Sequence, residues 1–294
     1  MNPKTLVMSG GAVRGMAFVG CLSCLKHHGL LAGIDTFVGS SAGALASLLA
    51  VIDFDLDAFP AWLCEQAHLT RFNKIDIEGV LELFERSGID PGDGLWDLAR
   101  NALRARGLVP EITFLELAKN TGKHLVVCVS NLTLGRAEHL SLDTAPDVPV
   151  ALALRMSMSV PIFYRPVERD GHLYVDGCVY DNLPMGYALN ECALNRRSGS
   201  VLALYVRDTV DDSFEIKNLS DLVARMMSTV LHRMTIDRVA QDPRAQLVEL
   251  AIQIPELNDV TSMDFSNMEF PVRESLLLKV MRMGYEQMSR HLKN

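Results

Sequence analysis

The sequence lacks an apolar segment long enough to cross a membrane. Its longest notable apolar stretch, Ala42–Ile52, covers about eleven residues, whereas a transmembrane helix needs roughly 20. The chain also does not open with a charged segment followed by a long apolar one, so no secretory signal is visible. These absences favour a cytoplasmic protein whose contact with membranes would be peripheral.

An excess of positive charge is also missing. Acidic residues outnumber basic ones by 36 to 28, which gives a formal net charge of -8. Such a chain has no overall basic footprint for nucleic acid, and an anionic membrane does not attract it as a whole. We therefore expect no nucleic-acid partner. Over 294 residues, 49% are hydrophobic and 22% charged, a composition that excludes disorder for most of the chain.

The cysteines show no sign of a disulfide framework. They are dispersed through a chain without an export signal, which favours reduced thiols: Cys21, Cys24, Cys64, Cys128, Cys178 and Cys192. Cys21 and Cys24 form a C-x-x-C pattern, and His27 and His28 lie one helical turn beyond it. No second pair of ligands has matching spacing, so we interpret these thiols as buried packing residues. The sequence thus predicts no metal site and no cofactor.

The first fifty residues contain two strand-turn-helix units. Thr5–Met8 is a short β-prone run, and a helical pattern follows over Met16–His28. A second strand is predicted at Thr36–Val38, a tight turn at Gly39–Gly43 and an apolar helix at Ala44–Ile52. Consecutive units of this kind are typical of a parallel sheet with helices on its faces.

Further strands return after a helical, more charged segment at about 53–123, which we interpret as an inserted lobe. Its helical pieces are Ile77–Arg86, Leu95–Arg106 and Phe114–Lys119. Leu125–Val129 and Leu202–Val206 are apolar runs of the type buried on both faces of a parallel sheet. Arg165–Val175 has the pattern of a hairpin that turns at Asp170-Gly171.

The last third of the chain is predicted to be helical. Two amphipathic stretches, Leu219–Val239 and Val272–Leu292, are separated by Pro243 and Pro255. Basic side chains gather in and just after the first of these stretches: Arg225, His232, Arg233, Arg238 and Arg244. Acidic neighbours dilute them, so a solvated face is favoured over a phospholipid-headgroup site.

The turn after the second predicted strand is a candidate catalytic element. Gly39-Ser40-Ser41-Ala42-Gly43 fits the pattern G-x-S-x-G, in which glycines two residues either side of a serine allow a sharp bend. The hydroxyl of Ser41 would then project above the N-terminus of the next helix. An ordinary strand-helix turn remains the alternative at this point.

A glycine-rich loop, Gly10–Gly15, follows the first strand and opens a helix, so its backbone N–H groups can converge on negative charge. An oxyanion hole is one interpretation and a nucleotide-binding loop is the other. The latter fits poorly, because no Lys-Ser/Thr pair follows Gly15 and Ala12 stands where a dinucleotide fingerprint needs glycine.

A base for Ser41 is harder to locate from the residues alone. None of the eight histidines has a supporting motif, although His232 and His291 lie in the late helical stretches. Asp170 and Asp176 each precede a glycine and flank a short strand. Asp170 fits a hairpin turn and Asp176 a loop after the strand, but spacing does not choose between them.

Three separated blocks, in order, resemble the patatin-like phospholipases. Ser9–Gly15 resembles the glycine-rich oxyanion loop of that family, Gly39–Gly43 its nucleophile elbow and Asp176-Gly177-Cys178 its Asp-Gly-Gly/Ala block. Val160–Phe163 and Asp181–Pro184 provide supporting matches. The resemblance covers about residues 6–206. The inserted lobe and the segment after about 208 have no recognisable counterpart.

The resemblance implies a three-layer α/β/α sandwich with a mostly parallel central sheet, built as one domain. Its core would span about 6–206, with the helical insertion at about 53–123 and a helical C-terminal extension at about 209–294. It also implies a lipid acyl hydrolase, acting on lipid or phospholipid, in which a Ser-Asp dyad works without histidine. No oligomeric state is implied.

The resemblance also assigns roles to residues. Ser41 would be the nucleophile and Asp176 the base, with Gly10, Gly11, Ala12 and Arg14 at the oxyanion hole. Two positions depart from the family pattern. Ala12 replaces a glycine and restricts φ, and Cys178 replaces a smaller residue next to the dyad. Neither change removes a reacting group.

Three other functions stay open on the sequence. An acyltransferase would use the same Ser41 intermediate with an alcohol as acceptor. A catalytically idle relative would act by binding, for example at a membrane surface. An α/β-hydrolase with a histidine triad would need His232 or His291 as its base.

Overall fold

The computed structural model describes residues 2–66, 69, 87–194, 200–207, 222, 225–226, 229–230, 233, 235, 245–252 and 268–293. The predicted helix Ile77–Arg86 lies outside the described residues, as does most of the predicted stretch Leu219–Val239. No described helix is both long enough and apolar enough to span a bilayer.

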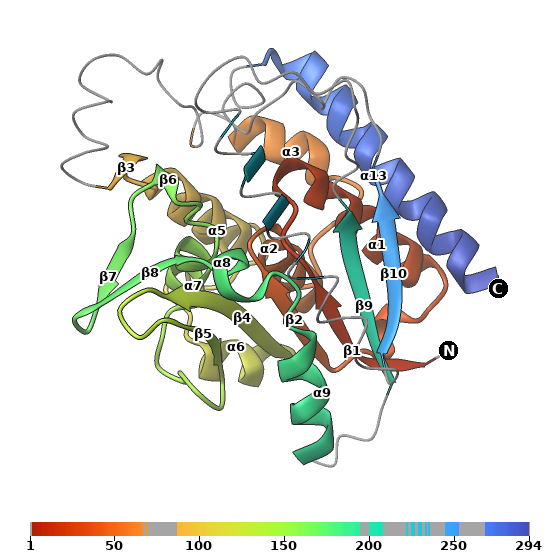
Figure 1. The fold of residues 1–294 in the computed structure, drawn as a ribbon. Coiled ribbons are helices and arrows are strands. Elements are labelled where there is room, and N and C mark those ends of the chain that lie inside the picture. The colour runs from red at the N-terminus through yellow and green to blue at the C-terminus, as the bar shows by residue number, and fades with distance from the viewer. Residues whose placement is uncertain are drawn as a thin grey trace.

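The core of the fold is an eight-stranded sheet (Figure 1). Its strands follow the order β10-β9-β1-β2-β4-β8-β7, and the first five are parallel. The bounds of these five are Ala245–Ala251 for β10, Ser200–Arg207 for β9, Pro3–Met8 for β1, Thr36–Ser40 for β2 and His124–Asn131 for β4. The predicted apolar runs of β4 and β9 are buried on both faces, as expected for central strands of a parallel sheet.

Beyond β4 the sheet becomes antiparallel. β4 pairs along one edge with β5 (Arg136–Ser141) and along the other with β8 (His172–Asp176). β8 in turn pairs with β7 (Val167–Arg169). The β7–β8 hairpin turns at Asp170-Gly171, where φ is 53° and 75°, as a tight hairpin with two left-handed residues requires. The predicted hairpin is therefore confirmed.

Strands β2 and β8 lie end to end along the same edge of β4. β2 pairs with β4 up to Ser40 opposite Cys128, and β8 pairs from Asp176 opposite Val129 to Tyr174 opposite Asn131. β5 overlaps both pairings on β4 and therefore occupies its other edge. The last residues of β2 and β8 thus face consecutive positions of one strand.

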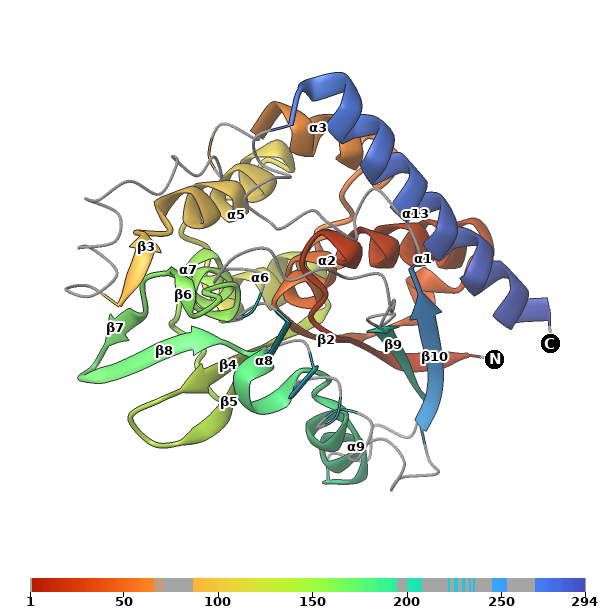
Figure 2. The same ribbon diagram turned by 45° about the horizontal axis from the view of Figure 1, so that its top comes forward.

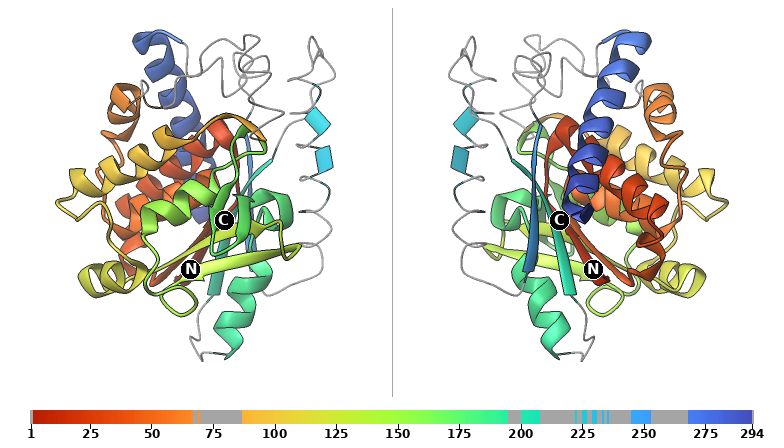
Figure 3. Two further views of the ribbon diagram at one scale, coloured as in Figure 1. Left: turned by 90° about the vertical axis from the view of Figure 1, so that its left-hand side faces the viewer. Right: turned by 90° about the vertical axis from the view of Figure 1, so that its right-hand side faces the viewer.

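Helices cover both faces of the sheet and make three layers (Figures 2 and 3). One face packs against α1 (Met16–His27), α2 (Ala42–Val51) and others, through side chains such as Leu6 and Phe37. The other face packs against α9 (Met185–Leu194), through Val7, Val38 and their neighbours. The predicted three-layer architecture is confirmed.

Shorter elements fill out the helical side. The remaining described helices are α3 (Phe59–Glu65), α5 (Asp93–Ala105), α6 (Phe114–Thr121), α7 (Val150–Ser157), α8 (Cys178–Asp181) and α13 (Phe270–Lys293), with 3-10 turns at Ala12–Gly15 and Leu31–Gly33. α6 begins with a capping box in which Thr113 and Glu116 exchange hydrogen bonds, and ends at Gly122 with φ 67°. These local signals explain why the prediction at 114–119 is confirmed.

The C-terminal third is not entirely helical. α13 confirms the predicted helix at 272–292, but β10 adds an edge strand to the sheet at 245–251, where no strand is predicted. The inserted lobe also holds a strand, β3 (Gly88–Asp90), which pairs with β6 (Ile162–Tyr164). Both strands depend on partners distant in sequence.

α13 packs tightly along α1. A Cβ on Gly20 of α1 would lie 1.8 Å from the carbonyl oxygen of Met281, and one on Gly284 would lie 2.0 Å from that of Ala17. Only glycine therefore allows the two backbones to approach this closely. Cys21 lies at the same crossing, where its thiol donates to the carbonyl of Gly284.

Candidate active site

Ser41 stands at the bend between β2 and α2 in a conformation that few residues adopt. Its φ is 51° and its ψ is -122°, so the backbone turns sharply as α2 begins. A Cβ on Gly39 would lie 2.3 Å from the carbonyl oxygen of Gly43, and one on Gly43 would lie 2.3 Å from that of Met8. The two flanking glycines are thus required by close backbone approach, as the G-x-S-x-G pattern predicts.

The side chains of Ser41 and Asp176 form a hydrogen bond. Ser41 Oγ donates to Asp176 Oδ2 over 2.7 Å, across 135 residues of sequence. The end-to-end placement of β2 and β8 on β4 brings the two residues together. Among the described residues, no histidine hydrogen-bonds to either side chain, and His232 lies outside them.

Asp176 is buried, at 2% exposed, and firmly oriented. Its Oδ1 accepts the backbone N–H of Cys178 at 2.9 Å, and its own N–H donates to Ser159 O at 2.9 Å. Burial raises the pKa of the Asp176 carboxyl, while the hydrogen bonds from Cys178 and Ser41 act in the opposite direction. A carboxylate with a raised pKa is a better proton acceptor than an exposed aspartate.

Ser157 holds the backbone of the bend at Ser41 in place, a role that the sequence hardly indicates. Its Oγ accepts the backbone N–H of Ser41 at 2.9 Å and donates to the carbonyl of Cys128 at 2.6 Å. This buried hydroxyl therefore ties the nucleophile to β4. The only sequence sign is a Ser-x-Ser pair at the end of α7, just before Val160.

The glycine-rich loop lies directly against the bend. A Cβ on Gly10 would lie 3.4 Å from Ser41 Cβ, and one on Gly15 would lie 2.4 Å from Ala42 Cβ. The N–H of Gly10 donates to Asn182, at 3.1 Å from both its backbone and side-chain oxygens. The amide of Gly10 is thus already engaged, which leaves those of Gly11 and Ala12 in the loop.

Gly11 and Ala12 begin the 3-10 turn, and their amides have no hydrogen-bond acceptor within the part of the chain that is described. The first N–H groups of a helical turn have no partner inside it. Ala12 has φ 44°, a left-handed value, so it occupies a position suited to glycine. Arg14 lies in the same turn and is half-buried.

Asn182 joins this loop to two other segments. Besides its bonds with Gly10, its Nδ2 donates to Thr235 Oγ1 at 3.2 Å. It follows α8, the short helix that begins after Asp176-Gly177. The Asp181–Pro184 block is a supporting match in the sequence, and the structure shows that its asparagine fixes the first glycine of the loop.

The C-x-x-C pattern does not form a ligand cluster. Cys21 points toward α13, and Cys24 Sγ lies 3.7 Å from His28 Nδ1 with no third ligand grouped there among the residues the structure describes. Burial raises the pKa of Cys21 and Cys24. The interpretation of these thiols as packing residues agrees with this placement.

Comparison with known proteins identifies the fold and the family. A sequence profile described as patatin-like phospholipase matches residues 6–189. A protein named probable lipid hydrolase 463L, from Invertebrate iridescent virus 6, is 29% identical over 186 residues, which is 63% of each chain. An uncharacterized protein, R571 of Acanthamoeba polyphaga mimivirus, is 25% identical over 93% of this chain and 89% of its own.

A solved structure gives the same fold. The crystal structure of VipD from Legionella pneumophila superposes with a TM-score of 0.52 at 16% identity, over 100% of this chain and 67% of that one. This chain therefore spans about two thirds of the length of VipD and of the viral lipid hydrolase. At this identity the structural likeness concerns the fold alone.

Proposed function

Because this chain belongs to the patatin-like phospholipase family, we propose that it is a lipid acyl hydrolase that cleaves carboxylic esters through a Ser41 acyl-enzyme. The observation that carries the proposal is the 2.7 Å hydrogen bond from Ser41 Oγ to Asp176 Oδ2 at a glycine-flanked bend. A nucleophile with its base in contact is the arrangement that covalent catalysis needs.

In the first half-reaction, Asp176 accepts the proton of Ser41 Oγ as that oxygen attacks the ester carbonyl. The resulting oxyanion is held by the amides of Gly11 and Ala12, with Arg14 adding positive charge. Collapse of the tetrahedral intermediate breaks the ester bond, and Asp176 returns the proton to the leaving alcohol. The acyl group stays on Ser41.

In the second half-reaction, Asp176 takes a proton from water, which attacks the acyl-enzyme. The same amides hold the second oxyanion, and Asp176 returns the proton to Ser41 as the fatty acid leaves. The backbone N–H of Cys178, which donates to Oδ1, keeps Oδ2 aimed at the serine throughout. One carboxylate thus acts as base and acid in turn.

The substrate is proposed to reach the site from a lipid surface that the protein contacts peripherally. Leu132, Leu134 and Leu173 are 43–45% exposed, and the N–H of Leu132 donates to the carbonyl of Leu173. Leu173 lies on β8, the strand that ends at Asp176. An exposed apolar group next to the catalytic strand suits contact with acyl chains. The cytoplasmic location stays a prediction from the sequence.

The test is labelling of the purified protein with a fluorophosphonate probe, together with hydrolysis of phospholipid in mixed micelles. Wild type is expected to label and to release fatty acid. Ser41→Ala should abolish both, with a loss in kcat on the order of 10⁶-fold, and Asp176→Asn should reduce both by about 10²–10⁴-fold. Full activity in either folded variant would contradict the proposal. Transfer of the acyl group to an added alcohol, in place of hydrolysis, would identify a transacylase.

A further inference from the structure

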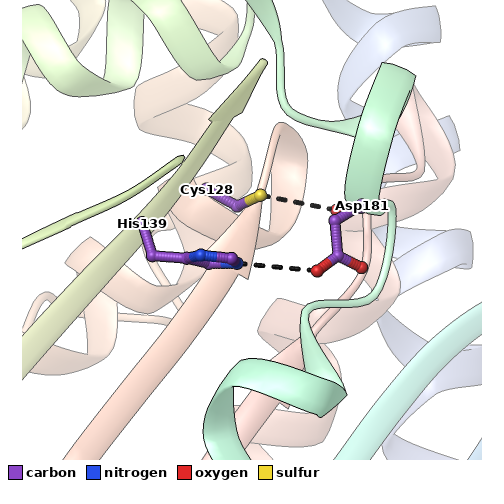
Figure 4. A group of neighbouring side chains, drawn as sticks. All are labelled: Cys128, His139 and Asp181. Carbon is purple, nitrogen blue, oxygen red and sulfur yellow. Dashed lines mark hydrogen bonds and ion pairs between the residues drawn. The ribbon is translucent and has the colours of Figure 1, made fainter. Parts of the chain in front are cut away.

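Three side chains that the proposed reaction does not use lie together (Figure 4), on the side of the sheet that α9 covers. One of them, Cys128, is paired with Ser40, the residue before Ser41. They are Cys128 on β4, His139 on β5 and Asp181 at the end of α8. One thiol, imidazole or carboxylate atom from each lies within 4.8 Å of the others. No other group of His, Cys and acidic side chains among the described residues has a geometry that suits a metal ion.

The backbone fixes the three positions independently. Cys128 and His139 are directly opposite each other in the antiparallel β4–β5 pair, so their side chains share one face. Asp181 is held at the same place because α8 follows its N-cap Gly177, where a Cβ would lie 2.3 Å from the carbonyl oxygen of Cys128. The group is therefore preorganised by main-chain packing.

The distances within the group leave room for an ion. His139 Nε2 is buried and makes no hydrogen bond with the described residues. The nearby carboxylate oxygen Asp181 Oδ2 lies 3.5 Å from it. A tetrahedral zinc ion with ligand distances of roughly 2.0–2.2 Å separates two such ligand atoms by about 3.3–3.6 Å. Cys128 Sγ points toward Asp181, whose carbonyl oxygen it reaches at 3.6 Å.

The histidine ring is also oriented by a neighbour. It stacks on Tyr187 of α9, with ring centroids 4.3 Å apart and planes inclined by 15°. Such outer contacts hold ligand rings in place in metal sites. The side chains of His139 and Asp181 are 17% and 15% exposed, so the group opens toward the surface on that side.

We propose that Cys128, His139 and Asp181 bind one zinc ion, with water at the fourth position. Thiolate, imidazole and carboxylate together match the ligand preference of zinc, whereas calcium and magnesium need oxygen ligands. Binding releases the thiol proton of Cys128 to solvent. The ion would connect β4, β5 and α8, and so would fix the segment whose Cys178 N–H orients Asp176.

The experiment is titration of chelator-treated full-length protein with Co²⁺, followed by displacement with Zn²⁺. We expect one equivalent of Co²⁺ to produce d–d absorption and a thiolate-to-cobalt charge-transfer band, and Zn²⁺ to remove both and raise the Tm. Cys128→Ser should remove the charge-transfer band. His139→Gln and Asp181→Asn should weaken binding by about 10-fold or more.

Two controls test the location. Cys24→Ser alters the other cysteine–histidine contact, and His124→Gln alters a comparable His–Asp pair in which Nε2 lies 3.4 Å from Asp143. Both should bind Co²⁺ as wild type does, as should Ser41→Ala, so the result is independent of the proposed reaction. Absence of binding at one equivalent, a charge-transfer band that persists in Cys128→Ser, or a band lost in Cys24→Ser would overturn the proposal.

Discussion

The sulfur of Cys178 occupies the space that a side chain on Gly10 would need. A Cβ built on Gly10 lies 2.1 Å from Cys178 Sγ, and Asn182 Oδ1 is 2.9 Å from the same point. Cys178 stands where the family pattern has a smaller residue, immediately after Asp176-Gly177. The loop and the acid-bearing turn are thus in direct contact, and this contact gives the first prediction.

Gly10→Ala should displace the loop and reduce kcat/KM by about 10²–10³-fold, the size of effect seen when an oxyanion donor is misplaced. The double variant Gly10→Ala/Cys178→Ala should recover most of this loss, because the sulfur no longer meets the new Cβ. Recovery should stay incomplete, since the contact with Asn182 remains. The control is Gly33→Ala, because a Cβ added to Gly33 would have no other atom within 4 Å. Hydrolysis rates of all three variants are compared. Equal losses in the single and double variants would contradict the prediction.

The buried carboxyl of Asp176 should give activity and stability opposite responses to pH. Because burial raises its pKa above the ordinary value near 3.8, kcat/KM should rise with pH along a limb that lies above the usual aspartate range. A rate that is flat down to pH 4 would exclude Asp176 as the base.

The same shift means that the folded protein favours protonated Asp176. Its contribution to the free energy of unfolding is therefore greatest below the unfolded pKa and is lost as pH rises through the raised folded pKa. Asp176→Asn carries no such loss. The Tm of Asp176→Asn minus that of wild type should increase with pH through this window and then level off, and a constant difference would contradict this.

Ala12 should tolerate glycine and reject larger residues, because its φ of 44° is left-handed. Ala12→Gly is expected to keep or slightly raise the free energy of unfolding and to preserve ester hydrolysis. Ala12→Val should lower that free energy by roughly 1–3 kcal/mol, as strained positions do. Urea denaturation measures both, with Ala32→Val as the control, since Ala32 is exposed and has no positive φ. Equal effects of valine at the two sites would refute the account.

The crossing of α1 and α13 should be sensitive to a single methyl group. Gly284→Ala places a Cβ where the carbonyl oxygen of Ala17 is only 2.0 Å away, and is expected to cost about 1–3 kcal/mol of stability. Gly186→Ala, on an exposed face of α9 with nothing within 4 Å, should be neutral or stabilising by up to about 1 kcal/mol. Chemical denaturation of both variants tests whether α13 is held by this contact.

The sequence predicts those parts of the site that depend on local backbone requirements. The glycines around Ser41 are visible because each avoids a backbone clash. The two Asp-Gly pairs limit the acid to Asp170 or Asp176, and the family resemblance chooses Asp176. Ser157 escapes prediction, since one buried hydroxyl that bonds with a distant N–H has no local pattern. The same holds for the partner that Asn182 provides for Gly10.

β10 shows a second limit of prediction from sequence. From Val248 to Ile252 buried and exposed residues alternate, which is the period of a strand. The alternation is short and follows a stretch predicted to be helical, so the sequence alone does not predict a strand there. Its pairing with β9 depends on residues some forty positions earlier, and only the assembled sheet identifies it as an edge.

The arrangement of β2 and β8 on β4 also orders the events of synthesis. The serine-bearing bend and all of β4 leave the ribosome well before Asp176 does, and β9, which pairs with β1, follows later still. Under the proposed mechanism, a nascent chain that ends before residue 176 has no proton acceptor for Ser41. We therefore expect it to be unreactive toward esters until the strand that carries Asp176 is in place.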